Sequence, residues 1–340
     1  MLSRGGARHR FQPTRRAKRG PPVATHAITA GDGTLHGRFS RDLPPALTVD
    51  SGDTVVLSTL DALWSLESPH EDGSPHRAYE PRRDGVDDGH ALTGPIAVRG
   101  AEPGMTLEVE LVSLRTGPWG WTFAARRATP LTERLGVSGR PALLRWELDR
   151  DSGLARDQFA HEVPLRPFLG VIGLAPAEPG LHPTWPPRRE GGNIDCRELV
   201  AGSRLLLPIA AEGALLSVGD GHAAQGDGEV SGTAVECAME RVELVVRLHE
   251  RLALETMQAE TPVGTLTLGV HEDLDEAAHI ALDAMVGLIS EREGLSRSQA
   301  LALASVVVDL RVTQIVNAGV RGVHALLPTG ALRRSRGEEK

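Results

Sequence analysis

ALTVDSGDTVVLSTL, residues 46–60, is the stretch that decides the fold class. Two short runs rich in Val, Leu and Thr flank Ser51-Gly52-Asp53, whose composition is typical of a turn between two strands. GAEPGMTLEVELVSL, residues 100–114, has the same organisation around Glu102-Pro103-Gly104. SRLLLPIAAEGALLSVGD, residues 203–220, adds two more apolar runs. Several short strands punctuated by turns predict a sandwich or barrel and not a parallel sheet with crossover helices.

Alternation of apolar and polar residues supports the strands. Leu107, Val109 and Leu111 occupy every second position, so they face one side of a sheet. VSGTAVECAMERVELVVRLHE, residues 230–250, alternates in the same way. We therefore expect a mainly β protein with a sandwich-like or barrel-like architecture, whose β-rich region covers residues 23–250.

The pattern changes to a helical period near residue 273. Ala278, Leu282, Met285 and Ile289 are spaced by four, three and four residues, which predicts one apolar face of a helix. Asp273 provides an N-cap and Gly294 ends the helix, and Ser296 with Gln299 has the spacing of a capping box for a second helix. Residues 251–330 are thus expected to form a C-terminal α/β segment with a helical hairpin. Packing against the sheet or a subunit contact is its simplest role.

The two ends of the chain differ from the rest. Seven Arg and Lys and no acidic residue occur in the first twenty positions, and a twin arginine is not followed by an apolar segment. We expect a disordered basic tail at residues 1–22 and a disordered tail at 331–340.

Composition excludes several classes of protein. Aromatic residues make up only 3% of the 340 residues and the net charge is −8, which argues against a nucleic-acid partner. No apolar run is long enough to span a membrane. The two cysteines form neither a disulfide framework nor a four-thiolate zinc site, so a cytoplasmic location is expected.

Polar residues of the kind that perform catalysis gather between residues 190 and 229, where glycines allow close backbone approach. The cluster comprises Asn193, Asp195, Asp220, His222, Gln225, Asp227 and Glu229. Carboxylates with one or more imidazoles can form a shell for zinc or another divalent metal. Further candidates lie in turns and loops elsewhere: His90, Glu102 and His182.

Each of these residues also has a simpler interpretation. The Asp-Gly pairs at 220 and 227 resemble plain turns, and His90 and His182 resemble ordinary loop histidines. Cys196 is better explained as a small buried residue than as a nucleophile, because no activating His lies in its local motif. The combination of the residues, and not any one of them, indicates a catalytic site.

The motifs LTGPI…GAEPG, PFLGVIGLAP, PPRREGGNID and LPIAAEGALLSVGDGHAAQGDGE resemble, in order and spacing, the acetamidase/formamidase family. EGLSRSQALALASVVVDLRVTQIVN is similar to that family's C-terminal segment, and the resemblance runs from Leu35 to Pro328. It implies a β-sandwich and barrel architecture with a small α/β part, assembly as a homo-oligomer (dimer or higher), and hydrolysis of short amides to ammonia and a carboxylate. Met105, where the family usually has an acid, and the compact region 61–90 depart from the pattern.

The residues that match the family's motifs are His90, Asp195, Asp220, His222, Gln225, Asp227 and Glu229. We expect a divalent metal, zinc first and calcium second, held by His90, Asp195 and His222, to activate the attacking water. Asp195, Asp220 and Glu229 are the predicted catalytic residues, with Glu229 or Asp220 as general base. Asn193, Gln225, Glu102 and His182 are the predicted substrate-binding residues.

Two alternatives remain open at this point. A close carboxylate pair such as Asp195 and Glu229 would hydrolyse the amide without metal by sharing a proton. A non-catalytic β-sandwich that binds a small molecule belongs to a different class, and the fold alone does not exclude it. The number of ionisable residues in glycine-rich segments favours an enzyme.

Overall fold

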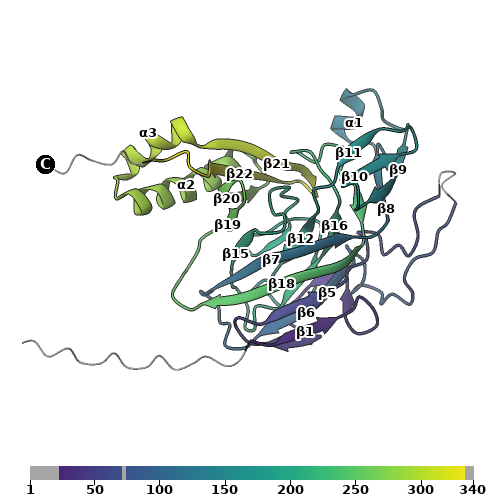
Figure 1. Ribbon diagram of the computed structural model, residues 1–340, viewed down its shortest axis with the longest axis horizontal. Coiled ribbons are helices and arrows are strands. Elements are labelled where there is room, and N and C mark those ends of the chain that lie inside the picture. Colours follow the sequence, from purple (N-terminus) through teal and green to yellow (C-terminus); the bar gives the residue numbers. More distant parts are fainter. Residues whose placement is uncertain (1–22, 71–73, 334–340) are drawn as a thin grey trace, which may run out of the picture.

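The computed structural model describes residues 23–70 and 74–333 (Figure 1). The predicted tail at 1–22 and residues 334–340 of the second tail lie outside this range. Strands make up 41% of the chain and helices 12%, and nearly all the strands belong to two large sheets, which confirms the mainly β prediction.

The first sheet has nine strands. In spatial order they are β1 (Thr25–Ile28), β5 (Thr54–Leu57), β18 (Met239–His249), β7 (Thr106–Thr116), β15 (Arg204–Pro208), β19 (Gln258–Thr261), β20 (Gly264–His271), β22 (Val320–Pro328) and β21 (Asp309–Asn317). The predicted boundary at residue 250 falls between β18 and β19, but β19 pairs with β15. The C-terminal segment therefore extends the same sheet.

The second sheet has eleven strands. Its main path is β11 (Glu162–Pro164), β10 (Leu154–Asp157), β9 (Ala142–Asp149), β8 (Trp119–Ala124), β17 (Glu236–Cys237), β16 (Leu216–His222), β12 (Phe168–Gly173) and β14 (Gly191–Asn193). β6 (Leu92–Val98) pairs with β16, with β2 (Leu35–His36) and with β4 (Leu47–Val49). A separate small sheet joins β3 (Arg38–Phe39) to β13 (His182–Pro183).

The two large sheets share one apolar core. Val109 and Leu244 from the first sheet and Ile172 and Val218 from the second are fully buried in the same cluster of side chains. Burial of both inner faces is the main stabilising term of such a sandwich. The predicted alternation is confirmed, since Leu107, Val109 and Leu111 are all fully buried.

The predicted turns at 51–53 and 102–104, and the segment between β15 and β16, connect the two sheets. β4 and β6 belong to the second sheet, and the strands that follow them, β5 and β7, belong to the first. β15 belongs to the first sheet, and β16, which follows it, belongs to the second. The strands on either side of each turn therefore do not pair with each other. Both strands of such a pair bury their apolar faces in the core between the sheets. Val49 of β4 and Val55 of β5 therefore lie in the same cluster although they belong to different sheets.

The C-terminal helices cover one part of the first sheet, as Figure 1 shows. α2 (Leu274–Glu293) packs on β20 and β22, and α3 (Arg297–Val307) packs on α2. Asp273 caps α2 by accepting a hydrogen bond from the Glu276 N–H, and Gly294 ends it in the left-handed conformation, as predicted. Among the helices of the described residues, none has the length and apolar character of a membrane span.

The predicted apolar stripe of α2 is confirmed at Met285 and Ile289, which are fully buried, and differs in the first two turns. Ala277 and Ala281 are fully buried, whereas Ala278 and Leu282 are partly buried. A Cβ added to Gly269 of β20 would lie 2.0 Å from the Ala277 carbonyl oxygen. Small residues at these positions therefore allow the helix backbone to approach the sheet closely.

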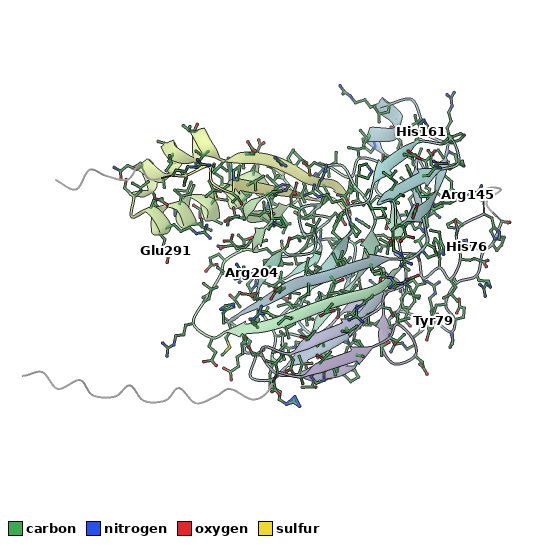
Figure 2. All side chains as sticks on the ribbon, in the orientation of Figure 1. His76, Tyr79, Arg145, His161, Arg204 and Glu291 are labelled. Atoms are coloured by element: carbon green, nitrogen blue, oxygen red, sulfur yellow. The ribbon has the colours of Figure 1, made fainter. Side chains whose placement is uncertain are left out.

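The connection between β5 and β6 lies beside the sandwich, where Figure 2 labels His76 and Tyr79. Trp64 is buried within it, and its indole N–H donates to the Gly89 carbonyl oxygen at 2.8 Å. The remaining short helix, α1 (Pro130–Arg134), lies between β8 and β9.

Candidate active site

Three neighbouring strands of the second sheet place the central side chains of the site. β16 pairs with β12 on one side, where His222 lies opposite Phe168, and with β17 on the other, where His222 lies opposite Glu236. The Phe168 ring contacts the His222 ring edge to face, with centroids 5.0 Å apart. Asp195 follows β14, and its backbone N–H donates to the Gly170 carbonyl oxygen of β12 at 3.2 Å.

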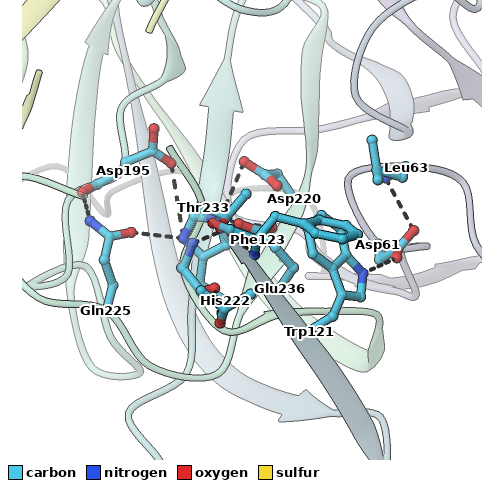
Figure 3. Close-up of polar contacts among 12 residues, drawn as sticks. Asp61, Leu63, Trp121, Phe123, Asp195, Asp220, His222, Gln225, Thr233 and Glu236 are labelled. Carbon is cyan, nitrogen blue, oxygen red and sulfur yellow. Dashed lines mark hydrogen bonds and ion pairs between the residues drawn. The ribbon is translucent and has the colours of Figure 1, made fainter. Parts of the chain in front are cut away.

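Figure 3 shows Asp195, Asp220 and Glu236 around His222, and Glu229 is a fourth carboxylate of the same group. His222 Nε2 lies 3.2 Å from Glu236 Oε2 and 3.4 Å from Asp220 Oδ2, and Nδ1 lies 3.9 Å from Asp195 Oδ1. Glu229 forms a second group with His222 and Glu236, in which the potential ligand atoms all lie within 4.8 Å of one another. All five side chains are buried. We call these five residues the carboxylate cluster.

Gly170 forms one wall of the carboxylate cluster. A Cβ at this position would lie 2.6 Å from Asp195 Oδ1, 2.6 Å from Asp220 Oδ2 and 2.8 Å from His222 Cε1. Glycine is therefore required for these three side chains to occupy the same space.

Gln225 fixes the orientation of His222. The Gln225 Nε2 amide donates to the Asp195 carbonyl oxygen at 2.8 Å, so Oε1 is the atom that faces His222 Nδ1 at 3.0 Å. Nδ1 must then carry the proton that Oε1 accepts. In the neutral imidazole this leaves the lone pair on Nε2, which faces Asp220 and Glu236.

Asn317, at the end of β21, holds Asp195 from the other side. Its Nδ2 donates to Asp195 Oδ2 and to the Asn193 carbonyl oxygen, the latter at 3.0 Å. Figure 1 shows β21 running from the helices toward the second sheet. The C-terminal segment, for which the sequence predicted only packing or a subunit contact, thus contributes a side chain to the site.

Burial raises the pKa values of three carboxyl groups in the cluster. It raises the pKa of Asp195 to about 7 and that of Glu236 to about 8. Burial, together with the charge of Asp195, raises the pKa of Glu229 well above its usual range. Charged carboxylates that lack water and lie close together favour either protonation or a bound cation.

The other two members of the cluster behave as an ion pair. Burial acts to raise the pKa of Asp220, but the charge of His222 outweighs it and holds that pKa below its usual range. Burial acts to lower the pKa of His222, but the carboxylates of Glu236 and Asp220 outweigh it and raise that pKa well above 6.5. Without a cation, His222 is therefore protonated.

Three residues of the cluster have strained backbones. Asp195, Asp220 and Glu229 have φ values of 51°, 56° and 45°. Non-glycine residues rarely adopt this left-handed region, and where they do the strain is often associated with function. The Asp-Gly at 220 is a strand residue of β16 and not a turn.

The other predicted residues lie at different distances from the cluster. His90 is buried, and its Nδ1 forms a hydrogen bond of 2.9 Å with the Thr184 hydroxyl group. It also interacts electrostatically with Asp220. Burial lowers the pKa of His90, so it is neutral. Asn193 is buried beside Asp195, and its Nδ2 donates to the Trp185 carbonyl oxygen at 3.2 Å.

Glu102 lies in the exposed turn between β6 and β7, and His182 Nε2 contacts the Glu178 carbonyl oxygen at 3.0 Å. Neither forms a hydrogen bond or ion pair with the carboxylate cluster within the described parts of the chain. Cys196 is fully buried, and burial raises the pKa of its thiol to about 12, consistent with a packing role.

Sequence reasoning missed Glu236 and Asn317. Glu236 stands between the buried residues Val235 and Cys237, and a carboxylate within an apolar strand was the available signal. Asn317 gave no local signal, because its role depends on where the C-terminal strands lie.

The donor atoms of the cluster fit a divalent cation. Asp195 Oδ1, His222 Nε2 and Glu236 Oε2 are buried and make no hydrogen bond among the described residues, although the latter two form an ion pair at 3.2 Å. Several buried carboxylates around one imidazole are stabilised by added positive charge, so a cation site is a physical explanation for their arrangement. Carboxylate oxygen with imidazole nitrogen is a donor set that zinc and related divalent metals accept.

Comparison of the chain with known protein families identifies its family. The profile of the acetamidase/formamidase family matches residues 24–185 and 177–333. The chain belongs to the acetamidase/formamidase family. The resemblance inferred from the motifs is confirmed, and the matched ranges include every member of the carboxylate cluster.

Individual relatives share less than a third of their residues with this chain, and their names agree with the family match. The chain is 29% identical to an acetamidase of Mycolicibacterium smegmatis, over 58% of this chain and 61% of the relative. It is 27% identical to a formamidase of Methylophilus methylotrophus, over 59% and 60% of the two chains. These alignments span about 60% of the curated relatives' length. The crystal structure of an acetamidase from Yersinia enterocolitica superposes with a TM-score of 0.78, 27% identity, and coverage of 93% of this chain and 95% of that one.

Proposed function

We propose that this protein hydrolyses short linear amides, of the formamide and acetamide type, to ammonia and a carboxylate. The observation that carries the proposal is the buried convergence of Asp195, Asp220, Glu229 and Glu236 on His222. Membership of the acetamidase/formamidase family and the names of the relatives support the same reaction.

Amide hydrolysis requires an activated water, charge stabilisation at the carbonyl oxygen and a proton for the leaving nitrogen. A divalent cation, zinc first and calcium second, would supply positive charge that polarises the carbonyl and lowers the pKa of water. Asp195, Asp220 and His222 would hold it, since their donor atoms form one compact group. His90, which faces Asp220, remains a proposed further ligand.

Glu229 is the proposed proton carrier. Its carboxyl group is buried and holds a proton readily, because burial and the neighbouring Asp195 raise its pKa. It would take a proton from the attacking water and give it to the departing nitrogen. Gln225 and Asn317 position His222 and Asp195 during this transfer, and Asn193 remains a proposed contact to the substrate.

A metal-free mechanism is the second candidate, and the raised pKa values of the Asp195 and Glu229 carboxyl groups favour it. Burial raises the pKa of Asp195 to about 7, and burial together with the charge of Asp195 raises the pKa of Glu229 well above its usual range. Two carboxyl groups that share a proton in this way can supply an acid and a base at the same pH. In this version, Asp195 and Glu229 perform the proton transfers without a cation.

Ammonia release from formamide, acetamide and propionamide tests the reaction, with Glu212→Gln as a matched control in an exposed turn. We expect release by the wild type and the control, and loss in Asp195→Asn. The absence of release by folded protein across the amides would contradict the proposal. Turnover that survives complete metal removal, verified by elemental analysis, would favour the metal-free mechanism. Assembly as a homo-oligomer and a cytoplasmic location stay predictions.

A further inference from the structure

A second charged site, formed by three arginines, lies outside the carboxylate cluster. Arg166, Arg197 and Arg311 line one cleft with a volume of about 510 Å³. They come from distant parts of the chain: the residues before β12, the segment after Asp195, and β21. Guanidinium groups that converge in this way offer forked donors that match the oxygens of carboxylates and phosphates.

The charges in the cleft are only partly compensated. The buried Glu198 forms ion pairs with Arg166 and with Arg311, the latter at 3.3 Å. Asp309 adds an exposed pair to Arg311 at 3.3 Å. These ion pairs involve Arg166 and Arg311 and leave Arg197 without one among the described residues.

Arg197 is the arginine left over. It forms no hydrogen bond or ion pair in the described parts of the chain, and its Nε is buried without a partner. The residue as a whole is only partly buried and lines the cleft, so the other donors of its guanidinium group would bind an external anion there.

The remaining wall of the cleft is apolar. Val200, Pro262, Val263 and Leu326 also line the cleft. Val263 lies in the turn between β19 and β20 and is 40% exposed, so it is accessible to a ligand. An inorganic oxyanion would fit the arginines but leave this wall uncovered, whereas a carboxylate with a hydrocarbon tail would match both halves.

We propose that this cleft binds a small aliphatic monocarboxylate, with its carboxylate at Arg197 and its hydrocarbon tail along Val200 and Val263. The site is separate from the carboxylate cluster and does not depend on the reaction proposed above. Each methylene group placed on the apolar wall adds about 0.8 kcal/mol, which is roughly a three- to four-fold gain in affinity.

Isothermal titration calorimetry with sodium formate, acetate, butyrate and inorganic phosphate at constant ionic strength tests this inference. For the wild type, we expect affinity to rise from formate to butyrate and phosphate to bind more weakly than butyrate. Arg197→Gln removes the free guanidinium without stranding a carboxylate, so the fold should survive while butyrate affinity falls on the order of ten-fold or more. Val263→Asp, at a half-exposed position, should also weaken butyrate binding by adding a negative charge to the wall.

Arg140→Gln, at an exposed arginine between α1 and β9, is the matched control and should bind butyrate as the wild type does. Thermal unfolding of every variant verifies that the fold is retained. Three results would overturn the inference: no saturable butyrate binding, butyrate affinity unchanged in folded Arg197→Gln and Val263→Asp, or phosphate binding more tightly than butyrate.

Discussion

Replacement of Gly170 by alanine is the sharpest perturbation of the carboxylate cluster, because it adds one methyl group and changes no charge. The new Cβ would lie 2.6 Å from oxygens of both Asp195 and Asp220. Ordinary contacts begin at 3.4 Å, so each oxygen must retreat by about 0.8 Å. Displacements of this size at a reacting centre cost on the order of 100-fold in rate.

The effect on stability should be much smaller than the effect on activity. Overpacking a buried site costs roughly 1–3 kcal/mol, and the lower entropy of alanine in the unfolded chain offsets about 0.4–1 kcal/mol of this. We therefore expect Gly170→Ala to fold, with a lowered free energy of unfolding in urea, and to lose about 100-fold in kcat for ammonia release.

Gly287→Ala is the control, since its added Cβ would meet only the Arg297 guanidinium at 3.6 Å within helix α2. It should keep full activity and gain about 0.5–1 kcal/mol of stability, because alanine is the better helix former. Wild-type activity in folded Gly170→Ala would contradict this prediction. It would mean that Asp195, Asp220 and His222, which the new methyl group displaces, do not take part in the reaction.

Three further predictions concern the cluster and the C-terminal helix. Glu236→Gln removes one carboxylate without changing the size of the side chain. It should weaken zinc binding and slow turnover by at least about ten-fold. Unchanged zinc affinity, measured by calorimetry, would exclude Glu236 from the site. In the presence of a chelator, thermal unfolding should show stability falling as the pH rises from about 7 to 8. In this interval the histidines of the unfolded chain are largely neutral, whereas the folded state still retains protons on Asp195 (pKa about 7) and Glu236 (about 8). Added zinc should reduce this loss, and stability that rises over the interval would contradict the assigned pKa directions. Asp273→Ala removes the N-cap of α2 and should cost about 1 kcal/mol in urea unfolding, whereas Asp273→Asn, which keeps an accepting oxygen, should cost less; equal losses would show that the cap oxygen is not the cause.

Much of the fold was predictable because its determinants are local. The alternation of Leu107, Val109 and Leu111 follows from the two-residue period of a strand, and Asp273 and Gly294 mark the ends of α2 through capping chemistry. Which strands pair is not a local property. The turns at 51–53 and 102–104 were predictable as turns, but only tertiary packing shows that they carry the chain from one sheet to the other.

The site was predictable in part for the same reason. Asp195, Asp220, His222 and Glu229 lie in glycine-rich motifs that can be recognised in the sequence, and the structure brings all four together. Their proximity requires the pairing of β12 with both β14 and β16, which no spacing along the chain encodes. Asn317 reaches Asp195 from 122 residues away, so its place in the site emerges only from the fold.

Whether the buried carboxylate cluster hydrolyses an amide bond can be measured in one NMR experiment. Doubly labelled ¹³C,¹⁵N-formamide is incubated with the wild type and with folded Asp195→Asn, and labelled formate and ammonium are measured together. We predict that the wild type forms both products in equal amounts and that Asp195→Asn forms neither above the uncatalysed rate. Equal product formation by the two proteins would contradict the account.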